Sequence, residues 1–386
     1  MTSQLLFHRP ELAKHYSRLV LSVSIGSASL SGVFFAAPRR TGKSTFVRED
    51  LRPELEKNGA LVVYADLWSN PTTDPGDVIV GAIRSKLSGD QNVLLRLAKK
   101  GGIDKVKMGN LSFDLDRIGL GKEVSLTEAL VALSDESKKM IVLIIDEAQH
   151  AITTDAGNSA LFALKAARDE LNSSSHHGLR VICTGSNQDK LAMLRNSKDQ
   201  AFFGAPMVKF PTLGKDYIEW FCSNAGLPFP LDPEEVWLLF GEAGYRPELL
   251  GSAADKFRFD FEADATNGPE RFATEVRQLA ADLNKTLRSV IHGLTPIQSA
   301  VIRVMATAGD NYAPFEASTM AKYKNAQELA GVPAEDVKVD VAGVQQALIA
   351  LQEKKLVWRA ARGVYAVEEK AIIELLRADG LLAGLE

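Results

Sequence analysis

Short apolar runs alternate with amphipathic segments through the first half of the chain. Runs rich in Val, Ile, Leu and Phe predict five strands, at 32–36, 60–66, 140–145, 179–184 and 207–210. The stretches between them have helical spacing, and this alternation is typical of a parallel α/β sheet with helices on its faces. One insertion, "KVKMGNLSFDL" at 105–115, alternates with period two around Gly109-Asn110 and predicts a hairpin.

The pattern becomes helical after residue 214 and changes again near residue 291. Asp232-Pro233 and Thr295-Pro296 both predict helix starts, because a capping side chain precedes a proline at the first helical position. Three helical segments and the two strands of "LVWRAARGVYAVE" then follow in the order of a winged helix. We therefore predict an α/β core at 1–214, a helical lid at 215–290 and a winged-helix domain at 291–386.

Composition and charge disfavour a membrane protein, a disulfide-rich protein and a strongly basic nucleic-acid-binding protein. Hydrophobic residues make up 46% of the chain and charged residues 24%, and the net charge of −4 predicts no general attraction to nucleic acid or to an anionic membrane. The two cysteines indicate a reducing compartment rather than a disulfide framework. No apolar run is long enough for a membrane-spanning helix, so we expect a cytoplasmic protein.

The first predicted strand leads into "AAPRRTGKST" at 36–45. In a G-x-x-x-x-G-K-[ST] loop the backbone N–H groups surround phosphates, the lysine reaches the β and γ oxygens, and the hydroxyl binds Mg²⁺. Ala37 replaces the first glycine, which the loop tolerates if φ at that position stays negative. The alternative is a chance GKS sequence in a turn. The residues expected to hold the phosphates are Ala37, Pro38, Arg39, Arg40, Thr41, Gly42, Lys43, Ser44 and Thr45.

The third predicted strand, within "KKMIVLIIDEAQH", ends in Asp146-Glu147. In phosphate-loop enzymes this aspartate holds Mg²⁺, directly or through water, and the following glutamate polarises the attacking water. A buried strand that merely ends in two acids is the alternative, which the phosphate loop upstream disfavours. We therefore predict catalytic roles for Lys43, Asp146 and Glu147, with Ser44 and Asp146 as ligands of Mg²⁺.

Two further motifs add candidate polar groups. "LRVICTGSNQ" at 179–188 ends a strand with Ser186, which could reach the γ-phosphate or the attacking water. "GEAGYRPELL" at 241–250 places Arg246 in a turn between two lid helices, from which it could reach the phosphates. The alternatives are a plain strand-ending turn and a solvated arginine at a helix cap.

With these motifs in order, the chain resembles the prokaryotic archaeal-type ATPases, close to the AAA+ and STAND groups of P-loop NTPases. Such proteins carry a GPRRxGKT loop, a strand ending in DExQ, a GS turn, a G-x-P turn in a helical lid and a winged helix. This chain has "APRRTGKS", "IIDEAQ", "CTGSN" and "GYRPELL" in that order, and "FHRPEL" at 7–12 resembles the segment near the base. The resemblance covers nearly the whole chain and implies an AAA+-like P-loop fold that binds ATP.

Carried over to this sequence, the resemblance makes Gln149 and Ser186 polar neighbours of the γ-phosphate and Arg246 the lid arginine. This sequence differs from the family pattern at one position, because Ala205 stands where many members have an arginine that acts on a neighbouring subunit. Possible substitutes are Arg39, Arg40, Arg168 and Arg195. We expect slow turnover without a partner, since such an arginine supplies several orders of magnitude in rate.

Charge leaves the role of the predicted winged helix open. Residues 291–386 contain ten Lys and Arg against twelve Asp and Glu, and only Arg359 and Arg362 lie on the wing. The presumed recognition helix offers Gln345 and Gln346, whereas Val344, Leu348 and Leu351 should face the domain core. DNA contact is therefore possible but not favoured by charge.

Three functions stay open at this point. The preferred one is an ATP-driven switch of the AAA+ and STAND type that assembles with itself or with a protein partner. The alternatives are a DNA-associated ATPase of the origin-recognition or transposition-regulator type and a scaffold that binds nucleotide without hydrolysis. The intact Asp146-Glu147 pair disfavours the scaffold, which has no need of a water-polarising acid.

Overall fold

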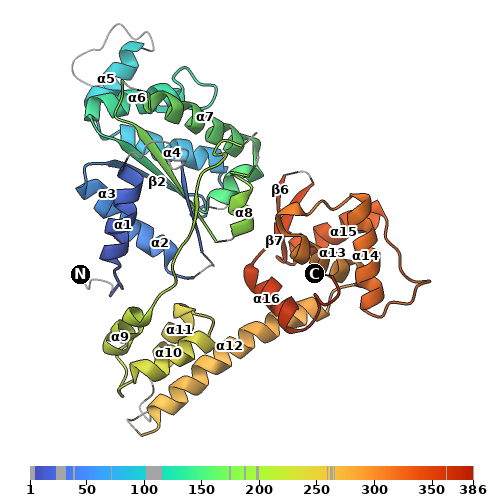
Figure 1. Ribbon diagram of the computed structural model, residues 1–386. Helices are drawn as coiled ribbons and strands as arrows, with labels where there is room; N and C mark the ends of the chain where they lie inside the picture. Colours follow the sequence, from blue (N-terminus) through green and yellow to red (C-terminus); the bar gives the residue numbers. More distant parts are fainter. Residues whose placement is uncertain are drawn as a thin grey trace.

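A parallel five-stranded sheet forms the centre of the N-terminal part of the protein (Figure 1). The structure is a computed structural model and describes residues 5–22, 32–37, 40–70, 72–100, 115–173, 175–186, 188–196, 200–258, 260, 264, 266–361 and 363–385. The strands are ordered β2-β3-β4-β1-β5. Their bounds are β1 Val33–Ala36, β2 Leu61–Asp66, β3 Ile141–Asp146, β4 Leu179–Gly185 and β5 Met207–Lys209. The five predicted strands are confirmed, whereas the predicted hairpin at 105–115 lies, except for Leu115, outside the described residues.

Helices cover both faces of this sheet (Figure 1). One layer contains α1 (Pro10–Leu21), α2 (Lys43–Phe46), the π-helical turn η2 (Val47–Leu51) and α3 (Arg52–Lys57). The other contains α4 (Pro75–Leu87), α5 (Gln91–Lys100), η3 (Leu115–Arg117), α6 (Leu126–Ser137), η4 (Ala148–Thr153), α7 (Asp155–Leu171) and α8 (Gln188–Ala192). The predicted α/β class with a parallel sheet is therefore confirmed.

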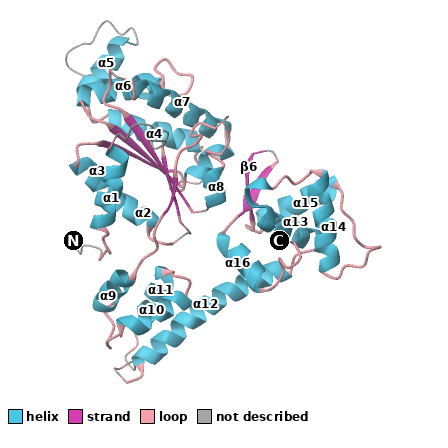
Figure 2. Cartoon of the chain, in the orientation of Figure 1, coloured by secondary structure: helices cyan, strands magenta, loops and turns pink. Residues whose placement is uncertain are grey.

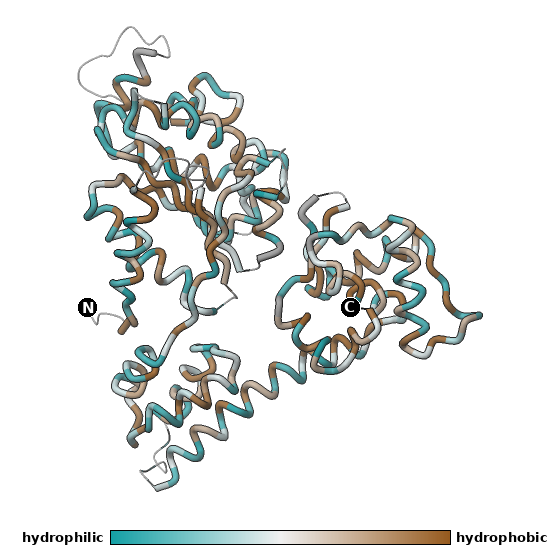
Figure 3. The backbone as a smooth tube through the Cα atoms, in the orientation of Figure 1, coloured by the Kyte–Doolittle hydropathy of each residue, from teal (hydrophilic) through white to brown (hydrophobic). Residues whose placement is uncertain are grey.

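The side-chain pattern of the strands explains the two layers. Successive side chains of a strand point to opposite faces, so Val33 and Phe35 pack towards α1 while Phe34 and Ala36 pack towards the opposite layer. All residues of β3 are buried, as expected for a central parallel strand. Figure 3 shows the strands as the most continuously hydrophobic part of this region.

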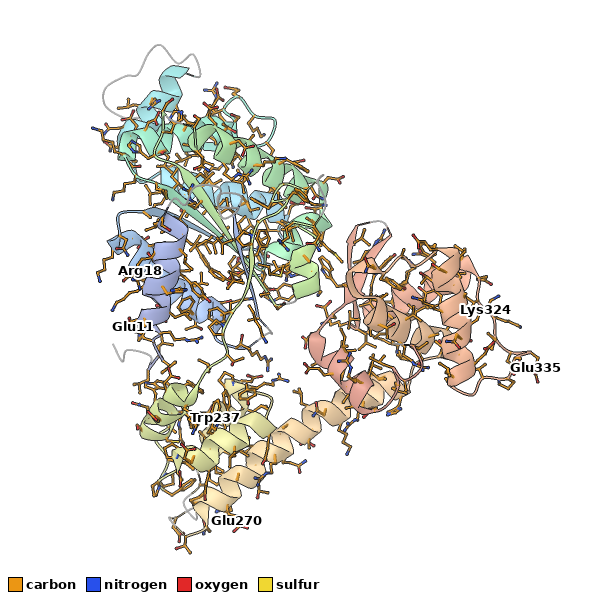
Figure 4. All side chains as sticks on the ribbon, in the orientation of Figure 1. Glu11, Arg18, Trp237, Glu270, Lys324 and Glu335 are labelled. Atoms are coloured by element: carbon orange, nitrogen blue, oxygen red, sulfur yellow. The ribbon has the colours of Figure 1, made fainter. Side chains whose placement is uncertain are left out.

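Four helices form the predicted lid: α9 (Lys215–Asn224), α10 (Pro233–Glu242), α11 (Pro247–Phe257) and α12 (Gly268–His292). Asp232 caps α10 by accepting a hydrogen bond of 2.8 Å from the Glu234 N–H, which confirms the predicted helix start. The lid has its own core, in which Phe240 and Phe272 are fully buried. Trp237 lies beside this core on α10 (Figure 4).

The C-terminal part has the predicted winged-helix order. It contains α13 (Pro296–Ala308), η5 (Gly309–Asn311), α14 (Ala317–Leu329), α15 (Val341–Glu353), β6 (Val357–Ala361), β7 (Val364–Val367) and α16 (Lys370–Ala378). Thr295 and Gln298 form a capping box at the start of α13. Val344, Leu348 and Leu351 are buried in the core of this part, as predicted. Helix α12 runs unbroken across the predicted boundary between the lid and this part. The division of the chain into three domains therefore remains a proposal.

The antiparallel hairpin β6–β7, the wing, lies beside α8 of the sheet region (Figure 2). Trp358 and Ala366 of the wing belong to the hydrophobic cluster that also contains the sheet residues Phe34 and Leu143. The wing is therefore packed against the α/β core rather than projecting into solvent along its whole length. No helix among the described residues is long and apolar enough to cross a membrane.

Candidate nucleotide-binding site

A cavity of about 560 Å³ opens at the carboxyl ends of the strands, where ligands of parallel sheets bind. It brings the predicted phosphate loop and the acidic end of β3 together. Its lining residues are Arg40, Thr41, Gly42, Lys43, Ser44, Thr45, Arg48, Asp66, Trp68, Ser69, Asp146 and Glu147.

The described residues of the loop before α2 have backbone conformations compatible with a phosphate loop. Gly42 caps α2 with φ of 80°, a value that glycine adopts without strain. Arg40 also has a positive φ, of 62°, whereas Ala37 keeps a negative φ and donates a hydrogen bond of 3.2 Å from its N–H to the Gly185 carbonyl. The methyl group of Ala37 is thus compatible with the loop. The other two predicted loop residues, Pro38 and Arg39, lie outside the described residues.

Asp146 is fixed at the end of β3 with 1% of its surface exposed. Its Oδ1 accepts hydrogen bonds from the Thr184 hydroxyl and from the Glu147 N–H, and its Oδ2 accepts one of 2.9 Å from the Tyr64 hydroxyl. Asp146 and the Ser44 hydroxyl line the same cavity, and this donor set fits Mg²⁺, which takes few protein ligands together with phosphate oxygens and water.

Glu147 is held by three side chains. Its Oε1 lies 2.9 Å from Lys43 Nζ, and its Oε2 accepts hydrogen bonds from Gln149 at 2.5 Å and from Ser186 at 3.0 Å. Burial alone would raise the pKa of the Glu147 carboxyl, but the Lys43 charge and these hydrogen bonds outweigh it, so the pKa lies below its ordinary value. Glu147 is therefore ionised at neutral pH and points into the cavity.

The side chains of Gln149 and Leu191 pack closely against Gly185 at the end of β4. A Cβ on Gly185 would lie 2.5 Å from Gln149 Oε1 and 2.6 Å from Leu191 Cγ. Gln149 is fully buried, and its Oε1 has no hydrogen-bond partner within the part of the chain that is described. Gln149 and Ser186 thus contact Glu147, and their predicted approach to a γ-phosphate stays a prediction.

The lid meets the phosphate loop through an acidic residue that the sequence analysis missed. Arg246 does not line the cavity; its Nε donates a hydrogen bond of 2.6 Å to Glu248 Oε1. The same carboxylate oxygen lies 3.9 Å from Arg40 Nη1. Glu248 therefore links the lid to the loop, and the predicted role of Arg246 at the phosphates stays a prediction.

The possible substitutes for the arginine absent at residue 205 differ in what they contact. Ala205 is fully buried, and its carbonyl accepts a hydrogen bond from Arg195. Arg168 is 8% exposed and bonds to Asp169. Arg40 lines the cavity with a largely exposed side chain, so it is the substitute best placed to meet a ligand among those the structure describes.

The N-terminal segment "FHRPEL" ties the core to the lid. The Arg9 guanidinium donates hydrogen bonds to the carbonyls of Pro211 and Thr212, in the linker between β5 and α9, at 2.9 and 3.3 Å. The Arg9 N–H and His8 both contact Asp50 in η2, just after the phosphate loop. A movement of the lid relative to the core would therefore disturb the contacts of this segment.

Several residues of the site were not predicted. Tyr64 and Thr184 position Asp146, and Arg48, Asp66 and Trp68 line the cavity. Asp66 ends the strand next to β3 and pairs in register with Asp146, so the rule that ligands gather at strand ends could have identified it. Tyr64 and Thr184 gave no such signal, because they lie within strands.

Two solved structures have a similar fold over almost the whole chain. The Walker-type ATPase PABY2304 of Pyrococcus abyssi matches with a TM-score of 0.51 and 16% identity, over 96% of this chain and 96% of its own. The ORC2 protein of Aeropyrum pernix, in its ADP form, matches with a TM-score of 0.53 and 14% identity, over 98% of this chain and 94% of its own. No family profile and no curated protein matches the sequence. The chain has the fold of these two proteins, and the predicted AAA+-like fold is confirmed.

Proposed function

We propose that this protein is an ATP-binding and ATP-hydrolysing switch of the AAA+ and STAND lineage, which couples its nucleotide state to self-assembly or to a protein partner. One observation carries the proposal: Lys43 and Ser44 of the phosphate loop share a cavity with Asp146 and Glu147. A scaffold that only binds nucleotide would not need the ionised Glu147 beside the phosphate-binding lysine. One of the two similar structures is a Walker-type ATPase, which agrees with this assignment.

The chemistry follows from the residues in the cavity. The Lys43 ammonium would leave Glu147 for the β and γ oxygens of ATP, and the loop N–H groups would surround the phosphates. Glu147 would then accept a hydrogen bond from the attacking water and orient it towards the γ-phosphate. Ser44 and Asp146 would hold Mg²⁺, which neutralises charge on the phosphate oxygens when it is bound.

The lid offers a route from nucleotide state to assembly. Glu248 of the lid faces Arg40 of the loop, and α12 continues from the lid into the winged-helix part. A change at the phosphates would therefore be passed along a rigid helix. We propose slow turnover of the partner-free protein in the cytoplasm, since residue 205 supplies no arginine to a neighbouring copy.

Glu147→Gln tests the proposal, because it keeps the side-chain shape and removes the charge that orients water. We expect hydrolysis to fall by at least about 100-fold while bound ATP is retained, measured by phosphate release and by nucleotide analysis of the isolated protein. The matched control is Glu49→Gln, an exposed residue on η2 outside the cavity. Wild-type hydrolysis in Glu147→Gln would show that the site is wrongly assigned.

A DNA-associated ATPase is the second candidate, favoured by the winged-helix order of α13, α14, α15 and the wing. Against it stands the negative net charge of residues 291–386. Stimulation of phosphate release by duplex DNA at physiological salt, lost in the double variant Arg359→Ala and Arg362→Ala, would favour it over the switch. Stimulation by a protein partner alone would favour the switch.

A further inference from the structure

One face of the wing packs into the α/β core, and the other packs into its own domain. Trp358 is 8% exposed and Ala366 is 5% exposed, and both belong to the cluster around the central sheet. Their neighbours along the same strands, Val357 and Val367, belong to the core of the winged-helix part. Side chains of a strand alternate between faces, so one face of the wing builds its own domain and the other faces the ATPase core.

A buried lysine fixes this contact. Lys190 on α8 is 1% exposed, and its Nζ lies 2.8 Å from Glu368 Oε1 and 5.0 Å from the centre of the Trp358 ring. Burying an ammonium group is costly unless a carboxylate or an aromatic face compensates it. The carboxylate and the aromatic ring both come from the wing and its end, so undocking the wing would take this ion pair and this aromatic contact away from Lys190.

One element under the wing carries a group that holds Glu147, and the other begins shortly after a second such group. Strand β6 packs on η4, which contains Gln149, and α8 begins two residues after Ser186 and contacts η4. Gln149 and Ser186 both donate hydrogen bonds to Glu147 Oε2. With Lys43 on Oε1, both oxygens of the water-orienting carboxylate are occupied while the wing is docked.

We propose that Lys190, Trp358 and Glu368 form an intramolecular latch that keeps the protein in a resting state. The docked wing braces η4 and α8, so Gln149 and Ser186 stay on Glu147 and hydrolysis is restrained. The docked face of the wing is at the same time withheld from any nucleic acid or protein partner. The opposite side of this domain, around Lys324 on α14, points away from the α/β core and stays accessible (Figure 4). The restraint on hydrolysis rests on the proposed function, whereas the docking itself does not.

Opening of the latch can be measured without ATP hydrolysis. We expect Trp358→Ala and Glu368→Gln to raise the radius of gyration in small-angle X-ray scattering. We also expect amide hydrogen exchange in η4, α8 and β6 to become about tenfold faster or more. Glu368→Gln keeps the side-chain shape, so it tests the latch even where Trp358→Ala fails to fold. The matched control is Val364→Ala, at the 38% exposed end of the same hairpin, which should behave as wild type.

Wing opening, measured by scattering and hydrogen exchange, tests the latch, and the rate of ATP hydrolysis tests the proposed function. Unchanged scattering and exchange in both latch variants would overturn the latch, whatever their hydrolysis rate. Open variants that hydrolyse ATP several-fold faster than wild type support the whole proposal. Open variants with unchanged hydrolysis would overturn the restraint on Glu147, and absence of hydrolysis in every protein would overturn the proposed function while the docking stands.

Discussion

The Lys43 ammonium lies 2.9 Å from Oε1 of Glu147, so the cation that we propose binds phosphate and the carboxylate that we propose orients water neutralise each other across the cavity. Lys43 is 5% exposed, and this ion pair is therefore shielded from solvent. A triphosphate must draw Lys43 away from Glu147 when it binds. The same contact thus sets the charge state of Glu147 and opposes nucleotide binding.

We expect Lys43→Ala to weaken ATP binding by about 100-fold or more, because removing one partner of a buried charged contact costs roughly 2–5 kcal/mol. Conversely, Glu147→Gln should bind ATP more tightly than wild type, since Lys43 no longer leaves an ion pair. Isothermal titration calorimetry measures both affinities. Lys57→Ala, at an exposed residue of α3, is the control. Equal affinities in all four proteins would contradict the role of Lys43.

The lowered pKa of Glu147 makes a stability prediction with a definite sign. Burial opposes ionisation, but Lys43, Gln149 and Ser186 outweigh it, so the folded pKa lies below the ordinary value of about 4.3. The ionised carboxylate therefore stabilises the native state above about pH 4.3, and this contribution is lost as pH falls through the folded pKa.

We accordingly expect the difference in unfolding free energy between wild type and Glu147→Gln to be largest near neutral pH. It should shrink as the pH is lowered below about 4.3. Urea unfolding of the nucleotide-free proteins, followed by circular dichroism at several pH values, measures this difference. A difference that grows on acidification would mean that Lys43 does not hold Glu147 in its charged form.

The sequence was most informative where neighbouring residues alone determine structure. The apolar run of β3 and the capped starts at Asp232 and Thr295 predicted their elements well, since each depends on neighbouring residues only. Contacts between elements distant in sequence were harder. The pattern placed Trp358 on a wing strand, but nothing in it distinguishes a side chain that packs on its own domain from one that packs on another.

In the site, too, local patterns were predictable and contacts between distant elements were not. Strand ends and the loop motif predicted that Lys43, Asp146 and Glu147 would lie together, because parallel strands bring their carboxyl ends to one edge, and they line one cavity. The rotamers of Gln149 and Ser186, which place both on Glu147, depend on tertiary packing that no local pattern encodes. Glu248 was missed for this reason too, as its contact with Arg40 crosses from lid to loop.

Gly185 should be intolerant of a side chain because Gln149 occupies the space of its Cβ. We expect Gly185→Ala to push Gln149 off Glu147 and to change the hydrolysis rate by about tenfold. The control is Gly251→Ala on α11, where a Cβ meets nothing within 4 Å. Single-turnover kinetics of both variants measure the effect, and a wild-type rate in Gly185→Ala would separate Gln149 from the chemistry.

Mg²⁺ dependence tests the environment of Asp146. Thr184→Val removes a hydroxyl that donates to Asp146 Oδ1, and losing such support of a metal ligand typically weakens metal affinity by about 10–100-fold. We expect a correspondingly higher Mg²⁺ requirement for hydrolysis, and loss of hydrolysis in EDTA for every protein. Thr286→Val, on the exposed face of α12, should keep the wild-type requirement. Equal Mg²⁺ titrations would show that Thr184 does not orient the ligand.

Ala37 tests whether the first glycine of the loop motif is needed here. Its φ is negative and its methyl group is 6% exposed, packed in the cluster with Phe35 and Phe46. Ala37→Gly should therefore cost stability, roughly 1 kcal/mol, because it removes a buried methyl and frees the unfolded chain. ATP affinity should change by less than about threefold, since backbone N–H groups hold the phosphates. Ala36→Gly, one residue earlier, should show the same loss of stability and the same affinity. A large gain in affinity confined to Ala37→Gly would instead mean that the methyl group narrows the loop.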